Sequence, residues 1–215
     1  MAKIYAFFNP LAGNGGCKED VTLLELLYDE QIIYCDMTLP ETYETQLFAL
    51  TPEDLLILCG GDGTVNRFVN LLQDLSIPCD ILLFPLGNRN NFARLLGHRF
   101  GDGPFSIKNQ LRRCPCITVN GQTRRFLWGV EFESATTRNH RATAHLGSTA
   151  LPFRSLCLTA GQPLTLQRRK PHRRKADCIP CGNQAELRFD RPISLYIDGE
   201  VMKTAESCTV CTETR

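Results

Sequence analysis

One short segment brings glycines, an acidic side chain and a hydroxyl together where an apolar run meets a helical pattern. Gly60-Gly61-Asp62-Gly63-Thr64 follows the apolar residues 54–59, and the periodicity of a helix starts directly after it. Backbone amides that no side chain blocks, set at the positive end of a helix, can bind phosphate oxygens. We therefore expect a phosphate-binding loop here. The alternative is an ordinary tight turn with a helix N-cap.

Asp62 and Thr64 are the two polar side chains of this segment. We do not expect Asp62 to contact phosphate directly, because both groups are anionic. It fits better as an indirect magnesium partner or as an acceptor that orients the loop. Thr64 can cap the following helix or bond a phosphate oxygen.

Three segments, in the same order along the chain, resemble the diacylglycerol kinase catalytic domain of the bacterial lipid kinases. Residues 9–13 read Asn-Pro-Leu-Ala-Gly and look like the N-P-x-[SA]-G loop of that family. Residues 60–66 look like its G-G-D-G-T-x-N motif, whose first five residues diacylglycerol, sphingosine, NAD and 6-phosphofructo kinases share. Residues 85–94 look like its P-x-G-T-x-N-D-F-A-R motif and favour the lipid branch over the NAD kinases.

The resemblance implies an ATP-dependent kinase that transfers the γ-phosphoryl group to a lipid hydroxyl, such as that of diacylglycerol, at the membrane surface. It also implies Mg²⁺ beside the nucleotide, because phosphoryl transfer depends on positioning and charge neutralisation. ATP is then expected in a cleft between two domains. The residues implied in the ATP site are Asn9, Pro10, Leu11, Ala12, Gly13, Gly60, Gly61, Asp62, Gly63, Thr64, Val65, Asn66 and Asn88.

Two weaker matches lie in the second half of the chain. Residues 126–134 resemble the F-x-N-x-x-G-x-G-F-D-A strand of the family, and residues 197–200 resemble its D-G-E turn. The acidic residues of that turn are assigned in the family as the base that deprotonates the acceptor hydroxyl. Asp198 and Glu200 are therefore the candidate catalytic residues. The alternative is a solvent-facing hairpin turn without a catalytic role.

Several positions depart from the family pattern. Asn88 stands at its threonine, Asn91 at its aspartate, Arg67 at its glutamate and Glu133 at the aspartate of G-F-D-A. A G-G-G and P-x-A-x-x-D-D-G segment with magnesium-associated aspartates has no counterpart here, so the metal ligands stay unassigned. The main alternative is therefore a nucleotide-binding pseudokinase, and the second is a kinase of a soluble acceptor such as NAD.

The chain contains eleven cysteines, four of which form two C-x-x-C pairs, Cys178 with Cys181 and Cys208 with Cys211. Paired thiolates at this spacing suit tetrahedral zinc, which would make a zinc-ribbon module. Coincidental thiols are the alternative that we favour, because a cysteine-rich chain produces such pairs by accident. Cys35, Cys59 and Cys79 lie in or beside apolar runs and are expected to be inert buried thiols.

The elements that position the three loops alternate between predicted strands and predicted helices, as in an α/β fold. Apolar runs at residues 3–9, 31–36, 54–59 and 81–84 predict strands, and the run at 54–59 predicts a central parallel strand. Apolar residues at helical spacing predict helices after Gly16, after Thr64 and at 92–96. We expect a nucleotide-binding domain over residues 1–100, with a parallel sheet like that of the NAD and diacylglycerol kinases.

A smaller, truncated β-rich substrate domain is expected over residues 101–215. Asn120-Gly121 is a strong hairpin signal and predicts that residues 117–119 pair with 125–130. Residues 141–159 have helical spacing, with a bend or break at Pro152. Residues 187–197 return to a strand pattern.

Composition limits the kinds of partner. The 24 basic and 23 acidic side chains nearly cancel, which gives no reason to expect nucleic-acid binding. No apolar run has the length of a signal peptide core or a membrane span, so we expect a cytoplasmic protein. The basic run at residues 168–175 either holds the protein against anionic lipid or is a solvated linker. Assembly into a homo-oligomer stays open.

Overall fold

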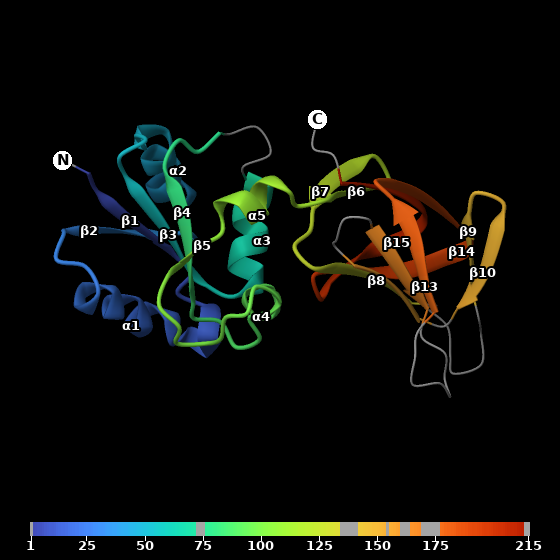
Figure 1. Cartoon of the computed structure of the whole chain (residues 1–215), viewed down its shortest axis with the longest axis horizontal. Helices are drawn as coiled ribbons and strands as arrows, with labels where there is room; N and C mark the ends of the chain where they lie inside the picture. Colours follow the sequence, from blue (N-terminus) through green and yellow to red (C-terminus); the bar gives the residue numbers. More distant parts are fainter. Residues whose placement is uncertain are drawn as a thin grey trace. The chain divides into compact units, whose positions relative to one another are not determined.

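The computed structural model of the protein describes residues 2–71, 76–133, 142–153, 155–159, 164–168 and 177–212. The chain forms two compact units, Met1–Leu111 and Arg112–Arg215. Each unit has its own sheet (Figure 1). The first unit continues past residue 100 because Phe105–Ser106 pairs with residues 82–83 of the first sheet.

A five-stranded sheet with the order β2-β1-β3-β4-β5 forms the centre of the first unit. The first four strands run parallel, and β5 is antiparallel to β4. This arrangement confirms the expected α/β fold with a parallel sheet in the N-terminal unit. The strand bounds are β1 Ile4–Phe8, β2 Ile32–Asp36, β3 Leu55–Gly60, β4 Asp80–Pro85 and β5 Phe105–Ser106.

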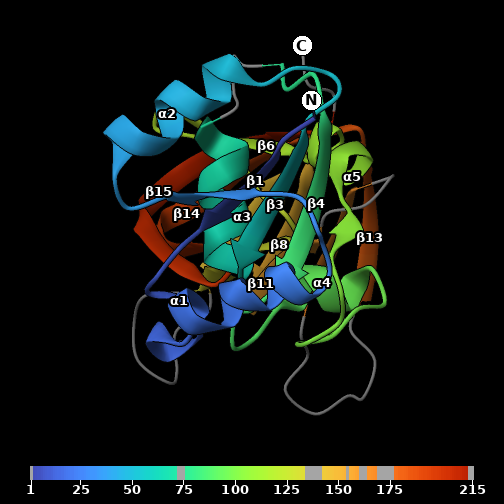
Figure 2. The same ribbon diagram turned by 90° about the vertical axis from the view of Figure 1, so that its left-hand side faces the viewer.

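Helices cover both faces of this sheet (Figure 2). Phe68 packs edge-on against Phe7 with 6.4 Å between ring centroids, whereas Leu24 packs with Ile4 and Ala6. Since neighbouring residues of a strand point to opposite faces, the helices that carry Phe68 and Leu24 lie on opposite faces. The helices are η1 Ala12–Gly15, α1 Cys17–Asp20, η2 Val21–Leu26, α2 Pro40–Ala49, α3 Asp62–Leu71, α4 Asn91–Leu95 and α5 Lys108–Arg112.

β3 is the central strand that its apolar run predicts. Leu56, Ile57 and Leu58 are completely buried, as expected where helices cover both faces of a parallel sheet. Cys35, Cys59 and Cys79 are also buried, which confirms them as core residues. Burial raises the pKa of each of these thiols above its ordinary value.

Ten antiparallel strands form the sheet of the second unit. Hydrogen-bonded neighbours follow the order β13-β12-β11-β8-β14-β15-β6-β7, and β9 joins β10 to β14. The strands are β6 Cys116–Val119, β7 Gln122–Arg125, β8 Gly129–Glu133, β9 Ala142–Leu146, β10 Thr149–Phe153, β11 Ser155–Thr159, β12 Leu164–Arg168, β13 Asp177–Gly182, β14 Gln184–Ile197 and β15 Glu200–Cys211.

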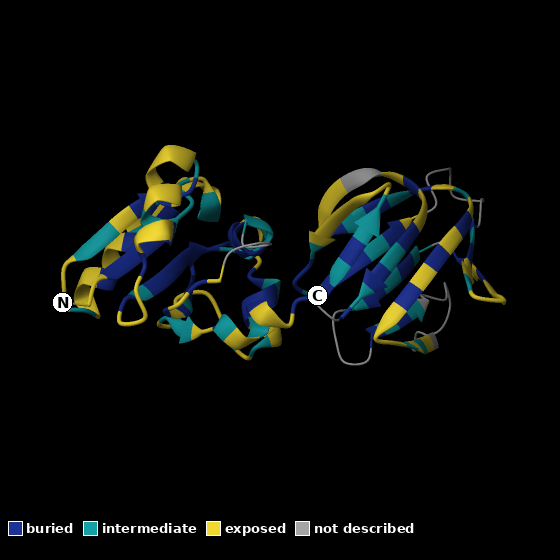
Figure 3. Ribbon diagram, turned by 90° about the horizontal axis from the view of Figure 1, so that it is seen from above, coloured by how far each residue is buried: buried dark blue, intermediate teal, exposed yellow. Residues whose placement is uncertain are grey.

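Alternation along the long strands separates the core from the surface in this unit. On β14, Ala185 and Leu187 are buried while Glu186 and Arg188 are exposed, and Figure 3 shows this alternation along the strands. A period of two places one set of side chains on each face of a sheet. The buried set joins Phe132, Leu156 and their neighbours in one apolar core.

Two expectations for the second unit are wrong. Residues 142–159 form the strands β9, β10 and β11 instead of a helix. The apolar residues of this stretch match a helix and a strand about equally, and pairing with β8 and β14 decides for the sheet. The hairpin turn at Asn120-Gly121 is present, but β6 pairs with residues 122–125, directly after the turn. The two-residue turn leaves no room for the later partner.

Among the described residues, no helix has the length and apolar character needed to cross a membrane. Residues 169–175, which make up most of the basic run, lie outside the described residues. The role of the basic run therefore stays a prediction.

Candidate functional site

Three loops meet at one edge of the first sheet. They follow β1, β3 and β4, and in the parallel register Phe8 lies opposite Cys59 while Gly60 lies opposite Pro85. Parallel strands end at the same edge, so the loops that follow them are neighbours. The structure therefore brings residues 9–13, 60–66 and 85–92 together.

The first loop follows β1 and is fixed by its own backbone and by β3. The Asn9 amide donates to the carbonyl of Cys59 at 3.4 Å, and the Leu11 amide donates to the side-chain oxygen of Asn9 at 3.0 Å. Gly13 adopts a φ of 61°, and a Cβ atom there would lie 2.7 Å from the carbonyl oxygen of Leu86. This contact requires glycine where the first and third loops touch.

The second loop approaches the third so closely that neither can carry a side chain at the crossing. A Cβ atom on Gly61 would lie 2.9 Å from Cα of Gly87, and one on Gly87 would collide with the backbone of Gly61. A Cβ atom on Gly60 would likewise collide with the side chain of Thr64. The glycines therefore allow bare backbone from two loops to lie side by side.

Asp62 links the second loop to the third through both carboxylate oxygens. Its two oxygens accept hydrogen bonds from the backbone amides of Asn91 and Phe92, each at 2.9 Å. These amides belong to the first residues of helix α4, where an acidic side chain satisfies donors that would otherwise be unpaired. Of the two roles considered for Asp62, the geometry supports the orienting acceptor.

Thr64 holds a polar atom that the described residues leave unsatisfied. Its side chain is 3% exposed, and its hydroxyl oxygen has no hydrogen-bond partner among them. An unpaired buried hydroxyl costs about 1–3 kcal/mol, so such an atom calls for an explanation. A ligand oxygen at the loop would supply the missing partner.

The third loop is held by Asn90, a residue that the sequence motifs did not single out for a role. Asn90 has a φ of 47°, and its side chain accepts from the Gly87 amide at 3.1 Å and donates to the Gly87 carbonyl at 2.6 Å. Asparagine is among the few residues that adopt this backbone conformation readily. Beside it, Asn88 donates to the side-chain oxygen of Asn14 at 2.7 Å and so ties the first loop to the third.

The charges around the loops suit an anion. Arg67, Arg89 and Arg94 are exposed on the segments that carry the second and third loops. Positive side chains near bare amides raise the local concentration of anionic ligands. Beneath the loops, burial raises the pKa of the Cys17 thiol to about 11, so it is protonated near neutral pH.

The remaining predicted site residues divide between surface and core. Leu11 is 76% exposed, whereas Val65 is 1% exposed and packs inside. Val65 therefore belongs to the core, and Thr64 is buried beside it, whereas Asn66 is partly exposed. Pro10, Ala12, Gly63 and Asn66 are partly or fully accessible on the same loops.

Asp198 lies in the second unit, on the two-residue turn between β14 and β15. It adopts a φ of 51° and is 9% exposed. Its carboxylate accepts from the backbone amides of Leu127 at 2.8 Å, Trp128 at 3.0 Å and Gly129 at 3.2 Å. The structure thus uses Asp198 to hold the segment that leads into β8.

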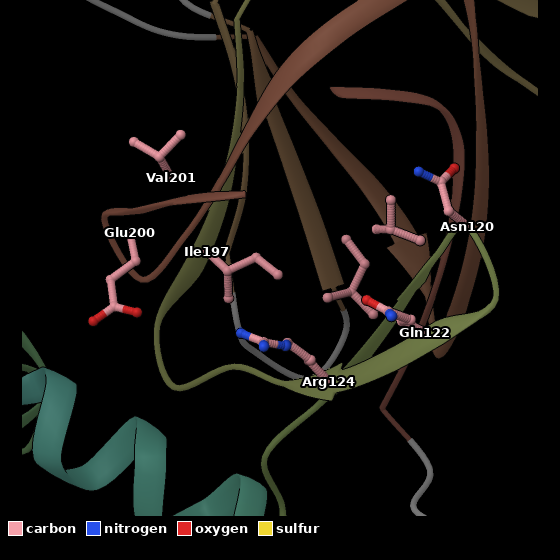
Figure 4. A pocket seen from close by; sticks show the side chains of 8 residues that line it. Asn120, Gln122, Arg124, Ile197, Glu200 and Val201 are labelled. Atoms are coloured by element: carbon pink, nitrogen blue, oxygen red, sulfur yellow. The ribbon is translucent and has the colours of Figure 1, made fainter. Parts of the chain in front are cut away.

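Glu200 lies two residues further along and is exposed. It pairs with Ile197 across the turn and lines a pocket of about 590 Å³ in the second unit. Of the two candidate bases, Glu200 is the one whose side chain lines an open space (Figure 4).

The two C-x-x-C pairs lie on strands that are not neighbours in the sheet. Cys178 and Cys181 are on β13, Cys208 and Cys211 are on β15, and β12, β11, β8 and β14 come between them in the strand order. Cys178 is exposed while Cys208 is buried. Within the described parts of the chain, no three His, Cys, Asp or Glu side chains gather to hold a metal ion.

Comparison with known proteins agrees with the geometry of the loops. The family model of the diacylglycerol kinase catalytic domain matches residues 3–114, which is just over half of the 215 residues. The chain belongs to this family. The matched range contains all three loops and the whole parallel sheet of this diacylglycerol kinase family member.

Curated relatives carry the same family name. A Caenorhabditis elegans protein named as a diacylglycerol kinase is 34% identical over 156 residues, which is 70% of this chain and 16% of that protein. The diacylglycerol kinase of Bacillus subtilis is 43% identical over 56 residues, 26% of this chain and 18% of that protein. The matched segments therefore span less than a fifth of the length of these relatives.

Solved structures show the same fold across both units. A diacylglycerol kinase from Bacillus anthracis has a TM-score of 0.61 and 15% identity, covering 97% of this chain and 92% of that one. An NAD kinase from Archaeoglobus fulgidus, solved in complex with ATP, has a TM-score of 0.55 and 13% identity, covering 98% and 90%. At these identities the likeness concerns the fold.

Proposed function

We propose that this protein binds ATP at the three loops and transfers its γ-phosphoryl group to a lipid hydroxyl, such as that of diacylglycerol, as a peripheral protein at the cytoplasmic membrane surface. The observation that carries the proposal is the crossing of Gly61 and Gly87 beside the buried hydroxyl of Thr64, which has no partner among the described residues. Bare amides and a free hydroxyl at the carboxyl edge of a parallel sheet suit a phosphate chain.

Each loop has a part in this assignment. Residues 9–13 and 60–66 hold the phosphates through backbone amides, and Thr64 bonds a phosphate oxygen. Asn88 fixes the first loop against the third through Asn14. Asp62 keeps α4 and the third loop in register through the amides of Asn91 and Phe92.

Mg²⁺, when bound to ATP, neutralises part of the phosphate charge. The described residues do not form a site of their own for this ion. Both oxygens of Asp62 accept backbone amides, and residues 67, 88 and 91 are Arg, Asn and Asn instead of the carboxylates or hydroxyl of the family pattern. As far as the described residues go, Mg²⁺ would accompany the phosphates of the nucleotide.

We assign the base to Glu200 and a positioning role to Asp198. A hydroxyl nucleophile needs a carboxylate within reach to take its proton. The Asp198 carboxylate already binds three backbone amides, whereas Glu200 lines the pocket. Asp198 orients the turn from which Glu200 projects.

A nucleotide-binding pseudokinase is the second candidate, and Arg67 and Asn91 favour it. They place a cation and a neutral amide near the loops where the family pattern has carboxylates. Such a protein binds ATP without transferring phosphate. The two candidates differ in one measurable property, which is turnover.

The test is transfer of labelled γ-phosphate by the full chain, with Mg²⁺, ATP and a panel of diacylglycerol, sphingosine, phosphatidylglycerol and NAD. The proposal expects transfer to a lipid and none to NAD. Calorimetric titration with ATP runs in parallel. Binding without transfer would establish the pseudokinase, and a folded protein that does not bind ATP would overturn both candidates.

The base assignment is tested with Glu200→Gln and Asp198→Asn in the same assay. Glu200→Gln should lower turnover by about 10²–10⁴, the usual contribution of a general base, while ATP affinity and unfolding midpoint stay unchanged. Asp198→Asn replaces a carboxylate that binds three amides, so it should lower the unfolding midpoint as well. Full turnover in Glu200→Gln would contradict the assignment.

A further inference from the structure

Two cysteines of the second unit stand directly opposite each other on neighbouring strands. Cys116, the first residue of β6, pairs with Cys211, the last residue of β15, in antiparallel register. Of the strand registers that the structure describes, this is the one that pairs two cysteines. Directly opposed residues of antiparallel strands have Cα atoms about 4.5–5.5 Å apart, within the roughly 4.4–6.8 Å that a disulfide spans. The register therefore suits a bond between the two sulfur atoms.

Both side chains project from the face of the sheet that lies away from the apolar core. Their neighbours Ile117 and Val210 are 1% and 0% exposed and belong to that core. Since successive residues of a strand point to opposite faces, Cys116 and Cys211 point away from it. Both are partly exposed thiols in the structure. A small oxidant in solution can therefore reach them.

Arg125 lies on the other side of Cys116 in the same row of side chains. It pairs with Cys116 across the β6–β7 hairpin, and its guanidinium donates a hydrogen bond to the Cys116 sulfur. Burial and the nearby Cys211 raise the pKa of the Cys116 thiol above 9.0, and the charge and hydrogen bond of Arg125 partly offset this rise. A thiolate is the form that attacks a disulfide, so Arg125 favours the reactive form of Cys116.

Hydrogen bonds hold the backbone beside each cysteine. The carbonyl of Pro115 accepts from the amide of Phe126 at 3.0 Å, directly before Cys116. The amide of Thr212 donates to the carbonyl of Asn183 at 2.9 Å, directly after Cys211. A disulfide forms without strain only where the backbone already has a suitable separation. These contacts keep the two strand ends in register.

Other cysteines of the chain lack either a cysteine partner or exposure. Cys17 and Cys59 lie close together, with the Cys17 thiol donating to the Cys59 carbonyl at 3.5 Å, but both are 0% exposed. Cys157 is partly exposed, but neither of its strand partners is a cysteine. Among the paired strands that the structure describes, exposure and a directly opposed cysteine coincide at Cys116 and Cys211.

We propose that Cys116 and Cys211 form a reversible disulfide when the protein is exposed to a disulfide oxidant such as oxidised glutathione. The Cys116 thiolate attacks one sulfur of the oxidant, which forms a mixed disulfide and releases one glutathione thiolate. The Cys211 thiolate then attacks the Cys116 sulfur and releases the second glutathione thiolate. The cysteine pair loses two electrons, the oxidant gains them, and the two glutathione thiolates take up the two protons of the cysteine thiols.

The bond joins the first strand of the second unit to its last strand. It closes a loop that contains nearly all of that unit, from residue 116 to residue 211. A crosslink over a loop of this length restricts the unfolded chain and so favours the folded unit. Oxidation is therefore expected to stabilise the second unit, independently of the proposed kinase function.

Peptide mapping of the full chain tests the proposal without any substitution. The protein is equilibrated at several ratios of reduced to oxidised glutathione, alkylated, and digested without reduction. Mass spectrometry should find a peptide that links residue 116 to residue 211, and excess reduced glutathione should remove it. Circular dichroism follows the fold in each sample. A folded chain that forms no such link at any ratio, or that joins Cys116 to Cys114 instead, would overturn the proposal.

Thermal unfolding compares Cys116→Ser and Cys211→Ser with Cys157→Ser, which removes another partly exposed cysteine of the unit. Oxidation should raise the unfolding midpoint of the wild type and of Cys157→Ser by about 5 °C or more, as expected for a crosslink over a long loop. Neither Cys116→Ser nor Cys211→Ser should show this rise. An equal rise in all three variants, or none in the wild type, would contradict the proposed pair.

Discussion

At the scale of the residue, the same side-chain type performs the same task in the two units. Asp62 and Asp198 are the acidic residues that a motif comparison marks first, yet both bind backbone amides. Carboxylates satisfy unpaired amides at turns and helix starts, and a hydrogen bond to a charged acceptor is stronger than one to a neutral acceptor. Their neighbours Thr64 and Glu200 are the groups left for a ligand.

Thr64→Val tests the orphan hydroxyl directly, because valine has nearly the same shape without the polar atom. We expect ATP affinity to fall about tenfold, the contribution of one hydrogen bond to a charged phosphate. The free energy of unfolding should be unchanged or slightly higher, since the lost hydroxyl has no partner among the described residues. Calorimetry and urea unfolding measure the two quantities.

Thr64→Ser is the matched control for this experiment. It keeps the hydroxyl and should retain most of the ATP affinity. Affinity of Thr64→Val equal to that of the wild type would show that the hydroxyl does not bind the nucleotide.

At the scale of the element, the contacts between loops and strand ends carry the site. Gly87 lies against Gly61, and Asn90 holds the turn between Gly87 and α4. Backbone packed this closely cannot move apart without losing the alignment of its amides. The alignment of the loop amides therefore depends on this crossing.

Gly87→Ala should disturb this crossing, because the added Cβ atom collides with the backbone of Gly61. We expect the free energy of unfolding to fall by about 1–3 kcal/mol, as for other overpacked positions. ATP affinity should fall with it. Gly103→Ala is the control, since a Cβ atom there meets nothing within 4 Å.

Thermal unfolding and calorimetry compare the two alanine variants. Gly103→Ala should match the wild type in both. Equal behaviour of Gly87→Ala and Gly103→Ala would contradict the close crossing of the loops.

Asp54 joins the starts of β1 and β3. It accepts from the amides of Lys3 and Thr51, each at 2.8 Å, and from the Thr51 hydroxyl at 2.9 Å. Burial opposes ionisation of Asp54, but these bonds and the nearby Lys3 outweigh it and lower the pKa below 3.8. Its stabilising effect is therefore complete above the unfolded-state pKa and disappears as the pH falls through the folded-state pKa.

Asp54→Ala consequently should destabilise the protein at pH 7 more than at pH 3. Urea unfolding at a series of pH values measures the difference in free energy between variant and wild type. Glu53→Ala, at the neighbouring exposed carboxylate, is the control variant. A difference for Asp54→Ala that stays constant down to pH 3 would contradict the lowered pKa.

At the scale of the whole molecule, the chain divides into a parallel unit and an antiparallel unit, each with its own core. The loops proposed to bind the phosphates belong to the first, and Glu200 and its pocket belong to the second. The loops proposed to bind phosphate and the pocket proposed to bind the acceptor are therefore supported by separate cores. This separation allows the two kinds of binding to be measured independently.

The cysteine pairs are tested on the whole protein by elemental analysis after purification without chelators. We expect less than one zinc per chain, because β13 and β15 are not adjacent in the sheet order and Cys208 is buried in the core. The Cys178→Ser, Cys181→Ser variant should give the same result. One zinc per chain in the wild type, lost in this variant, would restore the zinc-ribbon hypothesis.

The sequence by itself determined the parallel sheet of the first unit and the order of its loops. Apolar runs that end in glycine or asparagine are local signals, and a parallel sheet requires its strand ends to lie along one edge. The spacing of residues 141–159 predicts a helix, but the apolar positions of this stretch fit the period of a strand as well. Strand partners distant in sequence decided for β9 and β11, and β10 pairs with its neighbour β9.

Tertiary structure alone decided what each polar side chain of the site binds. Asp62 meets amides about thirty positions away, and Asp198 meets amides about seventy positions away. The pocket rim joins Arg124 to Glu200 from strands separated by most of the second unit. A spacing rule reaches only as far as one helix or strand, whereas hydrogen bonds and pockets form between whichever groups the packed chain brings together.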